Sequence, residues 1–367
     1  MLVTKRQYRG AEISAYNLSK ELLDKGHKVI WVGLYANNLE NTVVLDGAIN
    51  IDLPDSNFWL SYKKVKAIIS LYSKYKPDVC QANGSDTLRY LIAVKLLGFT
   101  PKIVYRNISI ISKWIDTQLK YFLFKFLFSK TDKVISVGDE ALDDFRHLFR
   151  FNEEKSMVIR RGVPNINPSD VEIDKIRKKY LISESDFVFI HIGHFSAEKN
   201  HKFLINVWEK LQLKSPIIKL ILLGDGPLRE SIGAYIEDKK LSSNILLPGL
   251  QTDSYNWLAL SKIMVLCSTI EGVPGVVVEA SFQGVPTVAV AVGGVKEVLI
   301  DNQNGLLVSS HDENLFVSAC EKLIADTDFR KLLASNAKKV VQKRFNLEVN
   351  TDHFINTYYS ILEKQLH

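Results

Sequence analysis

The chain has 367 residues, of which 46% are apolar and 24% charged, a balance that is ordinary for globular proteins. Its 47 basic and 41 acidic residues give a net charge of +6, which favours anionic ligands or an anionic membrane surface without requiring nucleic acid. Cys80, Cys267 and Cys320 are far apart and form no C-x-x-C pair, so neither a disulfide framework nor a zinc site is indicated.

The amino-acid sequence shows neither a membrane-spanning segment nor an export signal. No apolar run approaches the roughly 18 residues that a membrane span needs, and no signal peptide opens the chain. We therefore expect a cytoplasmic protein that is soluble or peripheral on the inner face of the cell membrane.

In the first half, short apolar runs alternate with longer amphipathic stretches, which is typical of a parallel sheet covered by helices. Only Met1 to Thr4 precede the first loop, so we expect a short or truncated first strand and a somewhat destabilised first domain. Further strands are predicted at 28–34, 78–81, 102–106 and 132–136, and helices at 11–25, 58–75, 86–97, 112–129 and 139–149.

A second series of the same kind begins at Phe187, after a segment from Gly162 to Asp170 that is rich in turn formers. We place the linker in that segment, which gives an N-terminal domain 1–165 and a C-terminal domain 166–346. The second series has predicted strands at 187–193, 217–223, 244–248, 263–267 and 286–292, and helices at 201–213, 227–238, 275–283, 313–325 and 329–343.

The segment from Ile263 to Gly284 is the most informative one. Its apolar beginning predicts a buried strand, a Gly/Pro loop follows, and a helix starts near Gly275 and stops at Gly284. The free N–H groups at such a helix start form an anion site at the end of the strand.

Two glutamates bracket this helix start, Glu271 in the loop and Glu279 in the helix. They could be a solvated loop charge and a residue that complements the helix dipole. However, Gly272 and Gly275 carry no side chain, so the backbone there can approach a ligand closely, which favours a functional role.

With this E-x7-E pair the sequence resembles the retaining glycosyltransferases of family 4. The resemblance spans nearly the whole chain and implies a GT-B fold of the α/β class, with two Rossmann-like doubly wound domains facing each other across a cleft. It also implies that the last helix, 347–367, crosses back onto the first domain. Besides the glutamates, the family's motifs are matched, in order, by Arg9-Gly10-Ala11-Glu12, Gly193-His194-Phe195-Ser196-Ala197-Glu198-Lys199-Asn200, Gly224-Asp225-Gly226-Pro227, Gly293-Gly294-Val295-Lys296-Glu297 and Asn304-Gly305-Leu306-Leu307-Val308.

The resemblance implies transfer of a hexose or N-acetylhexosamine from a nucleotide sugar, a UDP-sugar in preference to a GDP-sugar, to a saccharide or lipid-linked saccharide. The expected setting is surface polysaccharide synthesis. Alternatives are a nucleotide-sugar-binding protein with little catalysis, a nucleotide-sugar epimerase and a hydrolase. The hydrolase is disfavoured because Glu271 and Glu279 lie on one wall, whereas glycosidase carboxylates flank the scissile bond.

By the same resemblance, Glu271 would orient hydroxyls of the donor sugar and Glu279 would bind the ribose. The other donor-binding residues would be the amides of Gly275 and Val276 at the phosphates, Gly10 in the first-domain loop, Gly224 and Gly226 in the cleft wall, and Gly249 and Leu250 at the base.

Lys199 is the expected source of positive charge for the leaving diphosphate. It follows the strand predicted at 187–193, so its ammonium can reach the strand ends, although a solvated lysine is the alternative. In the family an arginine usually precedes this lysine, and His194 stands there instead, without the forked guanidinium geometry. Arg160 or Arg161 could supply the missing charge from the linker side.

A second departure is Asn107, where many family members carry a histidine beside the transferred sugar. Asn107 can hydrogen-bond a sugar hydroxyl but cannot exchange protons near neutral pH. In a retaining transfer the departing phosphate itself can take the acceptor's proton, so the substitution does not exclude catalysis, and we include Asn107 among the expected catalytic residues.

No metal or other cofactor is expected. Asp326-Thr327-Asp328 looks like the D-x-D of metal-dependent transferases, but it lies between two predicted helices and is interpreted as a helix cap. His191, His201 and His311 show no ligand spacing, so core or surface roles are expected.

Residues 112–133 interleave aromatic and basic side chains. A helix of this kind can lie in a bilayer interface, where a lipid-linked acceptor would be found. The alternative is that the apolar positions 115, 119, 122 and 126 pack the helix onto the sheet while its lysines face water.

Overall fold

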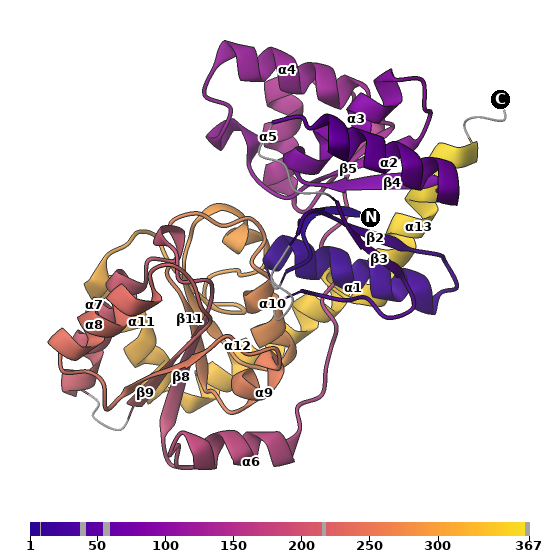
Figure 1. Ribbon diagram of the computed structural model, residues 1–367. Coiled ribbons are helices and arrows are strands. Elements are labelled where there is room, and N and C mark those ends of the chain that lie inside the picture. The colour runs from indigo at the N-terminus through magenta and orange to yellow at the C-terminus, as the bar shows by residue number, and fades with distance from the viewer. Residues whose placement is uncertain (8, 37–41, 54–58, 215–217, 364–367) are drawn as a thin grey trace. The chain divides into compact units, whose positions relative to one another are not determined.

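The computed structural model describes residues 1–7, 9–36, 42–53, 59–214 and 218–363 (Figure 1). Contacts divide the chain into two compact units. The N-terminal unit is Met1–Val163 together with Asn346–His367, and the C-terminal unit is Pro164–Phe345.

The N-terminal unit is built on a parallel sheet with the strand order β3-β2-β1-β4-β5-β6-β7. The order reverses beside β1, which is the doubly wound, Rossmann-like arrangement. Its strands are β1 (Leu2–Lys5), β2 (Ile30–Tyr35), β3 (Ile49–Asp52), β4 (Val79–Asn83), β5 (Lys102–Asn107), β6 (Lys133–Ser136) and β7 (Ser156–Val158). Its helices are α1 (Gly10–Asp24), α2 (Tyr62–Tyr75), α3 (Ser85–Leu96), α4 (Gln118–Ser129), α5 (Asp139–Phe149) and α13 (Leu347–Glu363), with short 3₁₀ turns η2 (Ile111–Lys113) and η3 (Glu153–Lys155).

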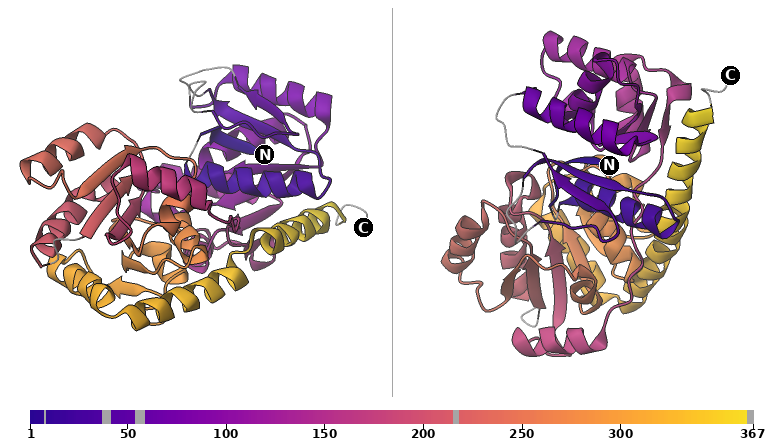
Figure 2. Two further views of the ribbon diagram at one scale, coloured as in Figure 1. Left: turned by 90° about the horizontal axis from the view of Figure 1, so that it is seen from below. Right: turned by 45° about the vertical axis from the view of Figure 1, so that its right-hand side comes forward.

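Consecutive side chains of these strands pack on opposite faces of the sheet. Val3, Trp31 and Val104 lie in a core with residues of α1 and α13, whereas their strand neighbours Leu2 and Val32 lie in a second core with α2 and α3. Helix α1 contacts α13, and α2 contacts α3 (Figures 1 and 2). Both faces of the sheet are therefore covered by helices.

The C-terminal unit repeats this topology with the order β10-β9-β8-β11-β12-β13. Its strands are β8 (Phe187–Ile192), β9 (Ile218–Leu223), β10 (Ile245–Gly249), β11 (Ile263–Leu266), β12 (Thr287–Val290) and β13 (Leu306–Val308). Its helices are α6 (Asp170–Lys179), α7 (His201–Lys214), α8 (Arg229–Asp238), α9 (Ser254–Ala259), α10 (Gly275–Phe282), α11 (Glu313–Ala325) and α12 (Thr327–Arg344), with 3₁₀ turns η4 (Ala197–Lys199) and η5 (Gly293–Glu297).

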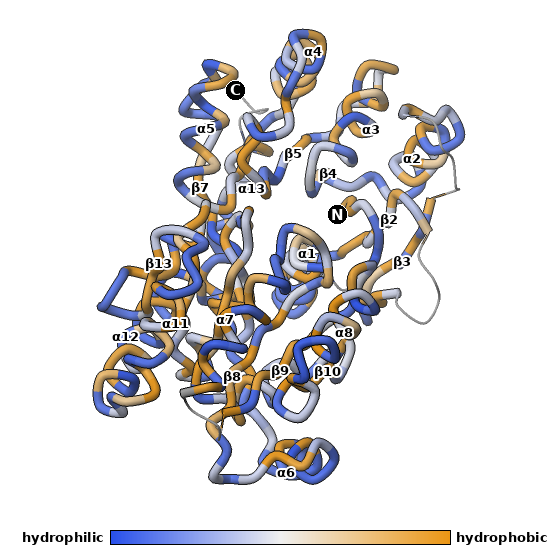
Figure 3. Tube along the Cα trace, turned by 90° about the vertical axis from the view of Figure 1, so that its left-hand side faces the viewer, coloured by the Kyte–Doolittle hydropathy of each residue, from blue (hydrophilic) through white to orange (hydrophobic). Residues whose placement is uncertain are grey.

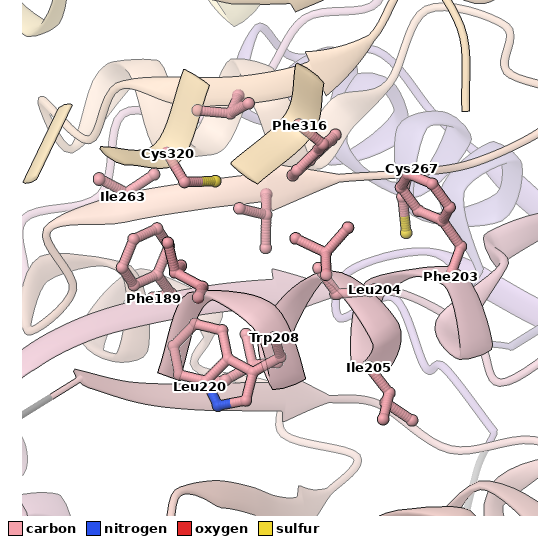
Figure 4. Close-up of a cluster of buried hydrophobic side chains, with 14 of the residues drawn as sticks. Phe189, Phe203, Leu204, Ile205, Trp208, Leu220, Ile263, Cys267, Phe316 and Cys320 are labelled. Atoms are coloured by element: carbon pink, nitrogen blue, oxygen red, sulfur yellow. The ribbon is translucent and has the colours of Figure 1, made fainter. Parts of the chain in front are cut away.

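The core of this unit joins α7 and α11 to the sheet. Trp208 of α7 meets Phe189 of β8 with ring centroids 5.3 Å apart, and Phe316 and Cys320 come from α11 (Figure 4). All four side chains are at most 1% exposed, so the sheet and its helices form one continuous apolar interior.

The two doubly wound sheets confirm the predicted fold class of each unit, and the short first strand is also confirmed, because β1 has four residues. The helix predicted over 112–129 is wrong at its start. A 3₁₀ turn ends at Lys113, and α4 begins at Gln118, where the Thr117 hydroxyl accepts the Lys120 N–H. At the start of a helix the first N–H groups have no partner within the helix, and a threonine hydroxyl can accept a hydrogen bond from one of them. Thr117 therefore allows a new helix to start there.

The exposure of α4 tests the alternative interpretation of its apolar row, in which positions 115, 119, 122 and 126 pack onto the sheet. Leu119, Phe122 and Phe126 are 80%, 62% and 44% exposed, whereas Leu127 and Phe128 are buried. The expectation that 119, 122 and 126 pack onto the sheet is therefore wrong. Hydrophobic and hydrophilic residues alternate along α4 (Figure 3). No helix in the described part of the chain is long and apolar enough to cross a membrane.

Candidate active site

The central feature of the C-terminal unit is an ion pair at the carboxyl edge of its sheet. Strands β8 and β11 are hydrogen-bonded neighbours, so the loops that follow them meet. Lys199 ends the turn after β8 and Glu271 lies in the loop after β11; Nζ is 2.5 Å from Oε1. The two side chains are 19% and 10% exposed, so they attract each other where little water screens them.

Ser268 and His311 hold the Glu271 loop, and sequence reasoning selected neither residue for this role. The Ser268 hydroxyl donates to the same Oε1 of Glu271 at 2.6 Å. His311 Nε2 lies 3.0 Å from the Cys267 carbonyl and 3.2 Å from the Ser268 carbonyl, so it donates to the end of the strand. A serine three residues before a loop glutamate is the available signal, but serines are common in loops.

Two glycines allow the neighbouring loops to touch. A Cβ at Gly224, whose φ is +141°, would lie 2.0 Å from the Gly193 carbonyl oxygen. A Cβ at Gly226 would lie 2.7 Å from the Phe195 nitrogen and 2.9 Å from His194 Cε1. Both positions therefore require glycine, and they fix the loop that carries His194 toward Lys199.

The start of α10 offers backbone donors, as predicted. The intrahelical bonds begin with Val277 and Val278, which donate to Pro274, so the N–H groups of Gly275 and Val276 precede them. Four residues into the helix, the Glu279 carboxylate accepts a hydrogen bond from Ser254 Oγ at 3.3 Å.

The residues predicted at the base lie at the end of β10. Gly249 has a φ of +85° and its carbonyl accepts the Gly224 N–H at 3.0 Å, which ties this strand end to the loop after β9. Leu250 is 45% exposed, so its side chain is free to contact a ligand.

His191 and His201 are core residues, as expected. His191 Nδ1 lies 3.0 Å from the Val265 carbonyl, and burial lowers its pKa to about 4. His201 stacks on Phe195 with ring centroids 4.1 Å apart, and burial lowers its pKa to about 2. Both imidazoles are neutral at physiological pH.

In the N-terminal unit, Gly10 begins α1 and Asn107 ends β5. Asn107 is fully buried, and its amide donates to Ser136 Oγ at 3.3 Å and to the Ala141 carbonyl at 3.0 Å. These bonds give Asn107 an internal structural role in this unit, and contact with a sugar stays a prediction.

The two arginines at the linker side also belong to this unit. Arg160 pairs with Asp139, and Arg161 is 8% exposed, with Nη1 3.8 Å from a Cβ built at Gly10. Both side chains thus have neighbours within their own unit.

The described residues contain no group of three or more His, Cys, Asp or Glu that could hold an ion. Asp326 of the D-x-D sequence is the N-cap of α12, where Oδ1 accepts the Phe329 N–H at 2.8 Å, so its interpretation as a helix cap is confirmed.

One cavity lies away from these residues. It has a volume of about 400 Å³, sits at the amino ends of β1, β2 and β4, and is lined mainly by aliphatic and tyrosine side chains. Ligands of doubly wound sheets bind at the carboxyl ends, so we assign no site to it.

Two family models match most of the chain between them. Residues 8–165 match the model described as Glycosyltransferase Family 4, and residues 172–340 match the one described as Glycosyl transferases group 1.

Among curated proteins, the chain is 23% identical to N-acetyl-alpha-D-glucosaminyl L-malate synthase of Bacillus anthracis, over 96% of this chain and 94% of that protein. It is 24% identical to an Escherichia coli enzyme named UDP-Gal:alpha-D-GlcNAc-diphosphoundecaprenol alpha-1,3-galactosyltransferase, over 82% of this chain and 80% of that one.

Solved structures give the fold. Anabaena HepE, crystallised with UDP and glucose, matches with a TM-score of 0.84 and 20% identity over 98% of both chains. Sucrose-phosphate synthase from Thermosynechococcus elongatus matches with a TM-score of 0.81 and 18% identity, over 97% of this chain and 94% of that one. These likenesses show the GT-B fold.

Proposed function

Because the chain belongs to glycosyltransferase family 4 and is a glycosyltransferase, we propose that it transfers a sugar with retention of anomeric configuration. The donor is a UDP-sugar in preference to a GDP-sugar, and it carries a hexose or N-acetylhexosamine. The acceptor is a saccharide or lipid-linked saccharide in surface polysaccharide synthesis. The names of the E. coli galactosyltransferase and of the HepE complex with UDP and glucose support this choice of donor and acceptor.

The observation that carries the donor site is the contact between Lys199 and Glu271 beside the start of α10. A nucleotide sugar has an anionic diphosphate, which a cation binds, and a sugar with hydroxyl groups, which a carboxylate binds. Lys199 binds the diphosphate and stabilises its charge as it leaves, while Glu271 accepts hydrogen bonds from sugar hydroxyls. The amides of Gly275 and Val276 add donors for the phosphates.

The transfer itself needs no protein base. The bond from the anomeric carbon to the diphosphate oxygen breaks, and a bond from that carbon to the acceptor oxygen forms on the same face. The acceptor's proton passes to the departing phosphate oxygen. Lys199 supplies the charge that a metal ion supplies elsewhere, so we propose that the reaction runs without metal.

We also propose that α4 binds the surface of a membrane that contains a lipid-linked acceptor. Leu119, Phe122 and Phe126 form an exposed apolar row, and Lys130 Nζ lies 5.4 Å from the centroid of the Phe126 ring. An apolar row flanked by cations suits the interface of an anionic bilayer.

Calorimetric titration with UDP and with GDP in the presence of EDTA tests the donor site. UDP binding is expected for the unmutated protein, and it should weaken at least tenfold in both Lys199→Ala and Glu279→Ala. Lys262→Ala is the matched control, because Lys262 is exposed and precedes β11 at the opposite edge of the same sheet. Failure of the unmutated protein to bind either nucleotide would contradict the proposal.

A further inference from the structure

The loop after β11 holds the backbone of the turn that ends at Lys199. The Thr269 N–H donates to the Glu198 carbonyl at 2.8 Å. Cys267 Sγ lies 3.3 Å from the Lys199 carbonyl oxygen and 3.4 Å from that of Asn200. Three consecutive carbonyls of the turn are therefore bonded to the neighbouring loop.

The Cys267 thiol is the donor in its part of this contact. The side chain is fully buried, and burial raises the pKa of the thiol to about 12, so the sulfur keeps its proton at neutral pH. A thiol carries one hydrogen and is a weak donor, so the two carbonyls share it.

The thiol contact lies where the chain changes direction. Asn200 has a φ of +53°, in the left-handed region that few residues other than glycine adopt and that asparagine tolerates better than most. Helix α7 begins at the next residue, and the Asn200 carbonyl also accepts the Leu204 N–H at 3.4 Å. Cys267 thus fixes the junction between the turn and the helix.

Ser268 stands between the two residues that bond to the turn, and it contacts the other member of the ion pair. Its hydroxyl donates to Glu271 Oε1, whereas its two neighbours contact the turn that ends at Lys199. Successive residues of an extended chain point to opposite sides, so one short segment can serve both charges. His311 bonds to the carbonyls of Cys267 and Ser268, which fixes the segment itself.

We propose that Cys267 is a positioning residue for Lys199, which fixes the backbone from which the ammonium reaches the diphosphate. The inference rests on the proposed function, in which Lys199 leaves Glu271 and binds the donor's phosphates. With the backbone held, only the side chain has to turn during this exchange. Small displacements of a charged group at a reacting centre are costly, so a fixed backbone favours transfer.

A double-mutant cycle on UDP binding, measured by calorimetry, tests the proposal. Cys267→Ala removes the thiol and should weaken UDP binding about two- to fivefold, as expected for one weak hydrogen bond. The same change made in Lys199→Ala should have no further effect, because the residue that Cys267 positions has lost its ammonium. A purely structural role would add its own loss to that of Lys199→Ala.

Two further variants separate the hydrogen bond from packing. Cys267→Ser keeps a donor, so its UDP affinity should stay within about twofold of that of the unmutated protein. Cys320→Ala is the matched control, because Cys320 is equally buried in the same core but lies apart from Cys267, in α11 (Figure 4). Cys320→Ala should lower the melting temperature and leave UDP affinity unchanged.

Hydrogen exchange of the unliganded protein provides a readout that does not depend on the nucleotide. The Leu204 N–H bonds to the Asn200 carbonyl, so it should exchange faster in Cys267→Ala and not in Cys320→Ala. An unchanged exchange rate in Cys267→Ala would overturn the inference.

Unchanged UDP affinity in Cys267→Ala, or additive losses in the cycle, would overturn it as well. If the unmutated protein binds UDP and Lys199→Ala weakens that binding, either result leaves the donor site standing.

Discussion

Lys199 and Glu271 neutralise each other in the free protein, with Nζ 2.5 Å from Oε1, and Ser268 donates to that same oxygen at 2.6 Å. A diphosphate that binds Lys199 must compete with Glu271 for it. When the ammonium turns to the phosphates, Ser268 still holds the carboxylate in place. In the proposed function, donor binding is therefore an exchange of partners within a site that is already assembled.

The first prediction concerns this competition. Glu271→Gln removes the carboxylate that competes for Lys199, so UDP should bind about three- to tenfold more tightly, in the range expected for a partly exposed ion pair. Transfer should slow at the same time, because the amide is a poorer acceptor for sugar hydroxyls. Calorimetry with UDP and the rate of UDP release from the donor measure the two effects.

Glu230→Gln is the matched control, since Glu230 is exposed on α8 of the same unit. It should change neither quantity. Weaker UDP binding by Glu271→Gln would mean that the contact with Lys199 organises the phosphate site and does not compete with it.

The second prediction tests whether Ser268 acts through the hydrogen bond of its hydroxyl or only through its packing. Ser268→Ala removes the bond that holds Glu271 once Lys199 has turned away, so kcat should fall about tenfold, which corresponds to about 1.4 kcal/mol. UDP affinity should change little, because UDP alone does not engage Glu271. Ser268→Thr keeps a hydroxyl and should recover most of the activity. Equal loss in both variants would point to a packing defect in place of a lost hydrogen bond.

The third prediction concerns Gly224. Alanine there would place a Cβ 2.0 Å from the Gly193 carbonyl oxygen and would also strain a φ of +141°. The loop carrying His194 and Lys199 must then move, so Gly224→Ala should lose UDP affinity and lower the melting temperature. Gly233→Ala is the control: its Cβ would meet nothing closer than 3.8 Å in the middle of α8, so it should stabilise the protein by up to about 1 kcal/mol. Equal UDP affinity in both variants would refute the assignment of Gly224.

The fourth prediction concerns the exposed row on α4. Phe122→Ser with Phe126→Ser should reduce sedimentation with vesicles of anionic lipid, because the apolar contact with the interface is lost. UDP binding should be unaffected. Phe126 and Phe122 can be changed with little effect on stability since they are 44% and 62% exposed. The proposal fails if the unmutated protein does not bind such vesicles at low salt.

The sequence predicted the central strands well, because each is a short apolar run with helices on either side. It missed β3, β7 and β13, which are only three or four residues long. It also missed the six-residue helix α9 and helix α6, whose sequence DVEIDKIRKK carries few apolar residues. Each of these three strands lies at an edge of its sheet and has a neighbouring strand on one side only. Edge strands are often short, so they lack the long apolar run that marks a central strand.

In the candidate site, Lys199 and Glu271 could be selected from position and from the family motifs, but their contact could not. It depends on β8 and β11 becoming neighbours, which follows from the strand order and not from the 72 residues that separate the two in sequence.

The last prediction is an acid sensitivity of the C-terminal unit. Burial lowers the pKa of His191 to about 4 and of His201 to about 2, whereas an unfolded histidine titrates near 6.5. Between these values the unfolded chain binds more protons than the folded one, so stability is retained above about pH 6.5 and falls as the pH drops toward 4. Each histidine can add up to about 1.4 kcal/mol per pH unit to this loss.

His201→Phe removes one of these groups and keeps the stack on Phe195, and neither nitrogen of His201 has a hydrogen-bond partner among the described residues. The variant should therefore lose less stability between pH 7 and pH 5 than the unmutated protein. Calorimetric unfolding measures this, with the transition of the C-terminal unit identified as the one that UDP raises. An equal loss of stability in His201→Phe and the unmutated protein would show that other groups cause the loss of stability at acidic pH.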